Sequence, residues 1–285
     1  MKKLKLFVVS FALMLSGFVY ATNISTWNEL KTYYGGAGSD GTLNILADIN
    51  FEGELTEHPG WTTLIIRGWN ASANKSAHRI LDGYDHGELY VWTTFKIGDH
   101  KTAIFSDLTL KRFRGPAAID TIDSFVTFNS TINFIDNTQV SISLFNSTAT
   151  FSDSFVNFSS NNYVLVDADG SLISFNNSFI NFTSTQTGTA IRAQTSSVSF
   201  NNSVINFVNN KSLVEGGAIY ADGSTISFSN STITFKNNFM RPNVKNDIYL
   251  EIYVDYLIQK EFEPEVVFNT NVYFLNGIRT TGTVV

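Results

Sequence analysis

The feature that most constrains this chain is a phenylalanine that returns at a nearly constant spacing. Successive members are separated by 24, 24, 25 and 28 residues, and they are Phe134, Phe158, Phe182, Phe207 and Phe235. A period between about 20 and 50 residues indicates stacked supersecondary units. Because one such unit cannot bury its apolar face alone, the units must stack into one continuous core.

Three short strands are predicted within each unit. One reads Ser-x-Ile/Val-x-Phe, as in Ser130, Ile132 and Phe134 of the first unit and Ser203, Ile205 and Phe207 of a later one. The next strand is of the type Ala218-Ile219, and the third ends in another phenylalanine, such as Phe228. Strand side chains alternate between two faces, so the Ser, Ile and Phe of the first strand point to one side. Three strands per ~24 residues predict a parallel β-helix whose coils stack at ~4.8 Å. An antiparallel sandwich also has short strands, but it gives no reason for a fixed period.

An asparagine follows most of the repeated phenylalanines by three residues. The series is Asn137, Asn161, Asn210 and Asn238, with Thr185 in the same place after Phe182. Asparagine tolerates the left-handed conformation of a corner, and its amide can bond to the equivalent residue one coil away. We therefore expect a structural ladder of these phenylalanines and asparagines. Asn-x-Ser/Thr glycosylation motifs also occur, but a chain this rich in Asn, Ser and Thr produces them by composition.

The N-terminal residues have the pattern of a bacterial secretory signal peptide. Three lysines precede an apolar run that ends in Val-Tyr-Ala at residues 19–21, so residues 1–21 are expected to be removed and Thr22 to begin the mature protein. Residues 22–41 are predicted to form an N-terminal helical cap, because Thr26 and Glu29 match a capping box. No further long apolar run follows, so we expect no transmembrane segment after cleavage.

Residues 42–285 are predicted to form a single parallel β-helix. An interruption is expected at about 239–265, where charged and aromatic residues replace the repeat. Irregular segments on a regular scaffold usually carry recognition, so the aromatic residues of such segments are the candidate binding residues. These are Tyr90, Trp92, Tyr249, Tyr253 and Tyr256, and residues 248–262 are expected to form a flap or partner surface.

Charge and cysteine content exclude several classes of function. The leader holds three lysines and no acidic residue, so its removal takes the formal net charge from −6 to −9, which disfavours nucleic acid as a partner. The chain has no cysteine, which excludes disulfides and thiol chemistry. The four histidines show no metal-ligand spacing, so we expect no metal and no other cofactor; they are His58, His78, His86 and His100.

Two short motifs recur in phase with the repeat. Gly216-Gly217-Ala218-Ile219 has a degenerate copy at residues 188–191, and Phe-x-x-Asn recurs at four of the five repeated phenylalanines. Over roughly residues 115–238 the chain thereby resembles the passenger repeats of chlamydial-type polymorphic outer-membrane proteins, a group of autotransporter adhesins. The resemblance implies a right-handed β-helical protein, secreted or at the surface of the bacterial outer membrane, that serves in adhesion or as an envelope component.

The tail lacks the series of ~10-residue alternating segments of a membrane barrel, so we expect a truncated passenger, a free secreted homologue, or a protein that docks on another outer-membrane protein as its anchor. The expected partners are a host-surface or envelope protein or a carbohydrate.

The alternative is a polysaccharide-processing enzyme of the pectate-lyase type, or a carbohydrate-binding β-helix, because β-helices also carry such activities. Catalysis would require clustered carboxylates with a basic residue nearby. The candidates are Asp120 and Asp123 with Arg112 and Arg114, and Asp167 with Asp169. Surface and turn roles explain these residues well, since Asp222-Gly223 repeats the turn pattern of Asp169-Gly170. We therefore expect a protein that is not an enzyme.

Overall fold

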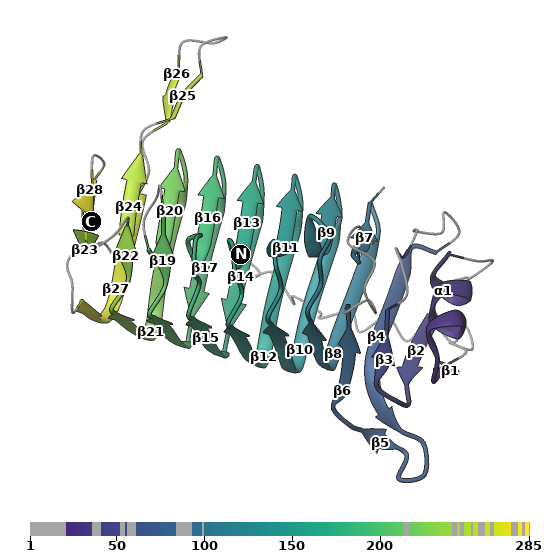
Figure 1. Ribbon diagram of the computed structural model, residues 1–285. Coiled ribbons are helices and arrows are strands. Elements are labelled where there is room, and N and C mark those ends of the chain that lie inside the picture. The colour runs from purple at the N-terminus through teal and green to yellow at the C-terminus, as the bar shows by residue number, and fades with distance from the viewer. Residues whose placement is uncertain are drawn as a thin grey trace, which may run out of the picture.

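The computed structural model stacks its strands side by side along one axis, as a parallel β-helix of about eight coils (Figure 1). It describes residues 21–35, 41–51, 55, 61–83, 93–98, 100–213, 217–240, 244–245, 248–251, 253–255, 260–262, 265–274, 279–280 and 283–284, with side chains described as far as Phe239. The parallel β-helix predicted from the repeat is therefore confirmed.

The larger sheet, here called sheet A, has 16 strands that pair in parallel except where β5 folds back on β4. In chain order they are β1 (Ala21–Ile24), β2 (Gly41–Ile45), β3 (Ile49–Asn50), β4 (Thr63–Asn70), β5 (Lys75–Ser76), β6 (Arg79–Asp82), β8 (Thr102–Lys111), β10 (Phe125–Ile135), β12 (Thr148–Ser159), β14 (Leu172–Asn176), β15 (Phe179–Thr183), β17 (Ser197–Asn201), β18 (Val204–Val208), β21 (Thr225–Lys236), β27 (Glu265–Phe274) and β29 (Thr283–Val284).

Sheet B has eight parallel strands and covers the other side of the core. They are β7 (Phe95–Ile97), β9 (Ala117–Ile122), β11 (Val140–Phe145), β13 (Val166–Asp169), β16 (Ile191–Gln194), β20 (Ile219–Asp222), β24 (Ile248–Glu251) and β28 (Arg279–Thr280). A three-stranded sheet of β19 (Lys211–Ser212), β22 (Phe239–Met240) and β23 (Val244–Lys245) and a hairpin of β25 (Tyr253–Asp255) and β26 (Lys260–Phe262) complete the described strands.

Each regular coil turns at three corners, at each of which one residue has a positive φ angle. Corner 1 joins sheet B to the first segment of sheet A, called A1; corner 2 joins A1 to the second segment, A2; and corner 3 follows A2. In the coil of β12, A1 spans residues 148–152, corner 2 is Asp153 (φ 50°) and corner 3 is Ser160 (φ 55°). The next coil has Asn177 and Ser184 in these places. Asn and Asp are common at the corners because they adopt the left-handed conformation at lower cost than other non-glycine residues.

The residue after each corner is buried and polar in most coils, and it bonds to the coil that follows. After corner 2, the Ser178 N–H donates to Ser203 Oγ at 3.0 Å, and the Ser203 N–H donates to Ser231 Oγ at 3.1 Å. After corner 3, the Asn137 N–H donates to Asn161 Oδ1 at 2.8 Å, and the Asn161 amide donates to the carbonyl of Phe134 at 3.0 Å. These bonds satisfy backbone groups that the strand ladders do not reach.

Phenylalanine columns fill the core between the sheets. Phe158, Phe182, Phe207 and Phe235 follow Phe134 in one column, with ring centroids 4.8–5.0 Å apart and planes within 8° of parallel. A second column consists of the inward phenylalanine near the end of each A1 segment. Its rings meet those of the first column edge to face: the ring centroids of Phe175 and Phe182, for example, are 6.0 Å apart and their planes are at 85°. All five rings of the first column are fully buried, so the repeat is the core itself.

Helix α1 (Trp27–Gly35) closes the N-terminal end of the stack (Figure 1). The Glu29 N–H donates to Thr26 Oγ1 at 3.3 Å and the Thr26 N–H donates to the Glu29 carboxylate at 3.1 Å, so the predicted capping box forms. Leu30 and Tyr34 are buried against the first coils. Among the described residues, no helix is long and apolar enough to cross a membrane.

Three details differ from the expectations. The segment 22–41 is not helical from its start, because residues 22–24 belong to β1, which pairs in parallel with β2. The predicted interruption at 239–265 includes a strand that continues the stack: β24 is in register with β20 in sheet B, whereas the antiparallel hairpin of β25 and β26 extends away from the stack (Figure 1). Ser130 does not face inward like Ser154, because its coil has one residue fewer there and Ser130 itself forms the corner.

We expect Phe207→Ala to lower the free energy of unfolding by ~3–5 kcal/mol, because it leaves a cavity between two stacked rings. Val204→Thr is the matched control, since Val204 lies on the same strand but is 39% exposed, and it should cost little. Urea denaturation of both variants measures the difference. Equal losses would contradict the assignment of inward and outward faces.

Candidate functional site

The outward faces of A1 and A2 are almost free of charge across five coils, from β10 to β21. In A1 the outward residues are Phe125, Thr127, Asn129, Thr148, Thr150, Ser152, Leu172, Ser174, Asn176, Ser197, Ser199, Asn201, Thr225, Ser227 and Ser229. In A2 they are Thr131, Asn133, Ile135, Phe155, Asn157, Ser159, Phe179, Asn181, Thr183, Val204, Asn206, Val208, Thr232, Thr234 and Lys236. Lys236 is the one charged side chain in these two sets.

Several of these outward side chains are bonded along the axis of the β-helix. The Asn201 amide donates to Asn176 Oδ1 at 3.0 Å in A1, and the Asn206 amide donates to Asn181 Oδ1 at 2.9 Å in A2. An asparagine has two amide hydrogens and a carbonyl oxygen with two lone pairs, so a single ladder bond leaves donors and acceptors for a ligand. The two faces thus form an ordered array of hydroxyl and amide groups on a rigid backbone.

Sheet B presents a charged row instead. Its outward residues include Lys96, Asp120, Ser143, Asp167 and Arg192, which are in register from coil to coil. The guanidinium of Arg192 forms an ion pair with the Asp167 carboxylate, with Nε 2.7 Å from Oδ1. The polar face and the charged face therefore lie on different sides of the molecule.

The carboxylates considered for catalysis are not gathered into one site. Arg112 lies at corner 3 and pairs with Asp82, whereas Asp123 lies at corner 1 and Asp120 on sheet B. The Arg114 N–H donates to the hydroxyl of Thr93.

The other candidate pair is also divided between two roles. Asp167 pairs with Arg192, and Asp169 ends its strand at the Gly170 turn, where φ is 58°. Asp169 Oδ1 there accepts a bond from the Thr195 hydroxyl at 3.3 Å. Within the described ranges, no three His, Asp or Glu side chains come together as metal ligands.

His78 is one of the two described histidines, and it lies beside two polar side chains. Its Nε2 lies 2.6 Å from Thr109 Oγ1, and that hydroxyl also accepts a bond from the Asn133 amide at 3.1 Å. Burial lowers the pKa of His78, and the negative charges of Asp107 and Asp48 partly oppose this shift. A histidine bonded to a hydroxyl can activate a nucleophile, but Thr109 is only 5% exposed and so is closed to a substrate. His100 forms part of corner 1, and His58 and His86 lie outside the described residues.

The predicted aromatic binding residues fall mostly beyond what the structure describes. Tyr90, Trp92 and Tyr256 lie outside the described residues, and for Tyr249 in β24 and Tyr253 in β25 the backbone alone is described. These five residues stay a prediction.

Other aromatic rings are exposed on the regular coils themselves, namely Phe125, Phe145, Phe155 and Phe179. Alternation already places Phe155 and Phe179 on the outward face, since each lies three residues before an inward phenylalanine. This spacing is the feature of the sequence from which an exposed aromatic surface could have been predicted.

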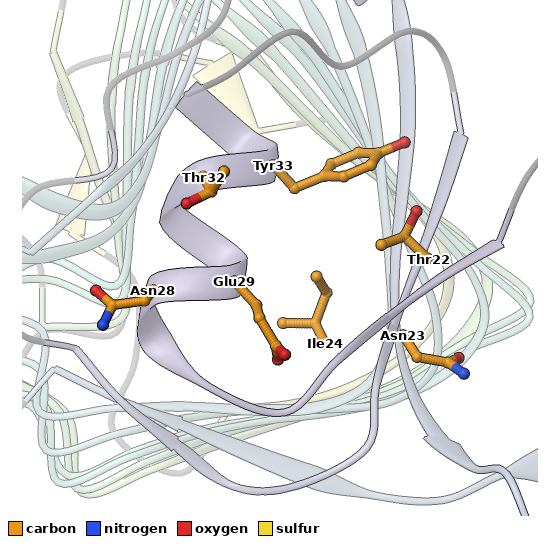
Figure 2. Close-up of a pocket in the computed structure, with 7 residues that line it drawn as sticks. All are labelled: Thr22, Asn23, Ile24, Asn28, Glu29, Thr32 and Tyr33. Carbon is orange, nitrogen blue, oxygen red and sulfur yellow. The ribbon is translucent and has the colours of Figure 1, made fainter.

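Hollows on the described surface include one beside α1 and one at corner 3. One of about 500 Å³ lies between β1 and α1 and is lined by Thr22, Asn23, Ile24, Asn28, Glu29, Thr32 and Tyr33 (Figure 2). Its one charged group, the Glu29 carboxylate, is engaged by the backbone of Ser25 and Thr26, and the first of these bonds is the main cause of its lowered pKa. The other, of about 460 Å³, lies at corner 3 and is lined by Ser160, Ser184, Thr185, Gln186, Asn209 and Lys211. Neither holds a cluster of groups suited to acid–base chemistry.

No family model matches the chain, and no curated protein matches it. The function is therefore inferred from the surface itself.

We expect His78 to make the folded state sensitive to acid. Because its folded pKa is lowered, the unfolded chain binds a proton more readily, so stability falls as pH drops below about 6.5. His78→Gln removes this titration, and its melting temperature should fall less than that of the wild type between about pH 7.5 and 5.5. An equally steep fall in both proteins would contradict this role.

Proposed function

We propose that the protein is an exported, surface-exposed β-helical adhesin or envelope structural protein that acts by contact and not by catalysis. The observation that carries the proposal is the array of hydroxyl and amide groups on A1 and A2, which extends over five coils with Lys236 as its one charged side chain. Such an array suits a neutral, hydroxyl-rich or amide-rich partner, because it offers many hydrogen-bonding groups and little charge that such a partner would have to desolvate.

The rigidity of the scaffold supports the same function. The array is fixed by backbone ladders on both sides and by side-chain bonds such as that from Asn206 to Asn181. A pre-ordered surface loses little conformational entropy when it binds, which favours adhesion over a long repetitive contact.

The resemblance of the Gly-Gly-Ala-Ile and Phe-x-x-Asn motifs to polymorphic outer-membrane protein repeats also supports an adhesive function. A host-surface or envelope protein or a carbohydrate is the proposed partner, with a separate outer-membrane protein as the anchor.

Binding should be lost when charge is placed on the neutral face. Ser174 and Ser199 are register partners in A1, and both are half-buried and outward. The double variant Ser174→Arg/Ser199→Arg should lower the binding of protein-coated beads to cultured epithelial cells and to a glycan array by about tenfold or more, since two desolvated guanidinium groups then oppose contact.

The matched control adds the same charge to sheet B, as Ser143→Arg/Gln194→Arg. Both positions are outward and lie in rows that already hold charged residues. This control should bind as the wild type does. Equal binding by all three proteins would overturn the assignment of the face. Release of unsaturated sugars from pectin by the wild type would overturn the non-catalytic function.

Export is tested separately. If the leader is cleaved as proposed, the mass of the protein recovered from the culture medium or the outer surface should correspond to a chain that begins at Thr22. Intact-mass spectrometry measures this directly. A surface fraction that retains residues 1–21, or a protein confined to the cytoplasm, would contradict the proposed location.

A further inference from the structure

The outward row next to corner 2 carries an apolar ridge at its centre. The row runs Thr131, Phe155, Phe179, Val204 and Thr232, with each residue in register with the next. Its three central residues are Phe155, Phe179 and Val204, hereafter called the Phe179 ridge. Their side chains are 44%, 38% and 39% exposed, respectively. Three adjacent exposed apolar side chains on three successive coils form a contiguous strip, which marks an interaction surface more often than scattered single residues do.

The geometry of the rings restricts what can bind the ridge. Phe155 and Phe179 stack on each other with centroids 5.3 Å apart and planes 4° from parallel. The face that each ring turns toward the other is therefore covered, and the pair presents mainly its edges to solvent. A sugar would need an open ring face to stack on, so the ridge suits another apolar surface better than a carbohydrate.

The surroundings of the ridge are suited to a second copy of this chain. The protein is acidic, with a net charge of −6, so two copies repel each other except through surfaces without like charge. Around the ridge, the row of corner 2 is Ser130, Asp153, Asn177, Asn202 and Asn230, and the next row of A2 is Asn133, Asn157, Asn181, Asn206 and Thr234. Asp153 is the one charged residue in these two rows.

The ridge is also self-complementary in polarity. The order polar, apolar, apolar, apolar, polar reads the same in both directions about Phe179. A two-fold axis at Phe179 would place Phe179 of one copy against Phe179 of the other, and Phe155 against Val204, as an isologous interface requires. It would also bring the Asp153 carboxylate near Asn202 of the other copy. Asp153 accepts one bond from the Asn177 amide at 3.3 Å and has further acceptor sites for that second amide.

A second exposed apolar cluster lies at corner 1, and it differs from the ridge in the charged residues around it. It consists of Ile122, Phe125, Phe145 and Leu172, which are 36–52% exposed. Asp123 lies between Ile122 and Phe125, and Asp169 is in register with Phe145. Two copies meeting there would bring carboxylates together, which costs energy. The corner 1 cluster is therefore the natural control for the ridge.

We propose that the Phe179 ridge is a homotypic interface through which two copies of the chain associate side by side and antiparallel about a two-fold axis. The ridge spans three coils, or roughly 10 Å along the axis, so the interface belongs at the small end of specific interfaces. We expect a weak dimer, with a Kd in the micromolar range or above. The ridge is part of the outward face of A2, so the dimer would cover part of the neutral array, but its formation does not require that the protein be an adhesin.

Sedimentation velocity from low micromolar to near-millimolar concentration tests the dimer. The wild type should move from monomer toward dimer mass, and Phe179→Thr, which copies the residue type at both ends of the row, should weaken association about tenfold or more. Phe145→Thr at corner 1 should leave association unchanged, with circular dichroism to show that both variants fold. A wild type that stays monomeric, or assembles beyond a dimer, would overturn the proposal. Equal weakening by the two variants would do the same.

Cross-linking tests the two-fold axis directly, because the chain has no native cysteine. Phe179→Cys alone should give a disulfide-linked dimer on mild oxidation, since the axis brings the same position of two copies together. Phe155→Cys and Val204→Cys proteins should cross-link to each other when mixed more than either does alone. Cross-linking of Phe145→Cys as fast as Phe179→Cys would overturn the axis. If instead the wild type is monomeric and binds phosphatidylcholine vesicles, and Phe179→Thr loses this binding, the ridge contacts a lipid surface and the dimer proposal is overturned.

Discussion

The hydrogen bonds that cross each corner to the next coil hold this fold together. After most corners the chain buries a residue whose backbone N–H is beyond the reach of the strand ladders, and a side-chain oxygen of the following coil accepts a hydrogen bond from it. The Ser147 N–H donates to Ser171 Oγ at 3.0 Å, and the Ser171 N–H donates to Ser196 Oγ at 2.9 Å. A buried donor without an acceptor costs about 1–3 kcal/mol, so each coil depends on the next and none is stable alone.

The apolar core follows from the same register. Once the corner bonds fix each coil above the last, equivalent side chains must lie one coil repeat apart, and phenylalanine rings can stack at that distance. Phe151 and Phe175 are 4.5 Å apart and Phe175 and Phe200 are 4.7 Å apart. The stacked columns bury large apolar areas without disulfides, which explains how a chain without cysteine reaches a continuous core.

The sequence predicts this interior well because the interior is what repeats. The buried positions of Phe158 and Asn161 follow from spacing and alternation alone. Ser130 was misplaced because it matches the Ser-x-Ile-x-Phe pattern, and a coil shorter by one residue cannot be distinguished from that pattern without its neighbours. The sequence also does not show where the stack is interrupted, because residues 248–251 include charged and aromatic residues but still continue sheet B.

The surface was harder to predict because it depends on which residues meet across coils. Arg112 is close in sequence to Asp120 and Asp123, but the winding of the chain places it against Asp82, 30 residues earlier. The neutral face is visible in the sequence only after each outward position is assigned to a row. Alternation predicts that Phe155 and Phe179 face outward, but their meeting with Val204 in one ridge follows only from the register between coils.

The near absence of charge on A1 and A2, where Lys236 is the one charged outward residue, is not imposed by stacking alone. In-register stacking brings like residues together in a row, and like charges directly opposite each other are destabilising, so a repeated charge is disfavoured on any face of a β-helix. Sheet B shows that this constraint does not require neutrality, because opposite charges lie in register there: Asp120 is in register with Lys96, and Asp167 pairs with Arg192. Stacking alone therefore permits charge on A1 and A2, and the scarcity of charge there is the feature on which the proposed contact with a neutral partner rests.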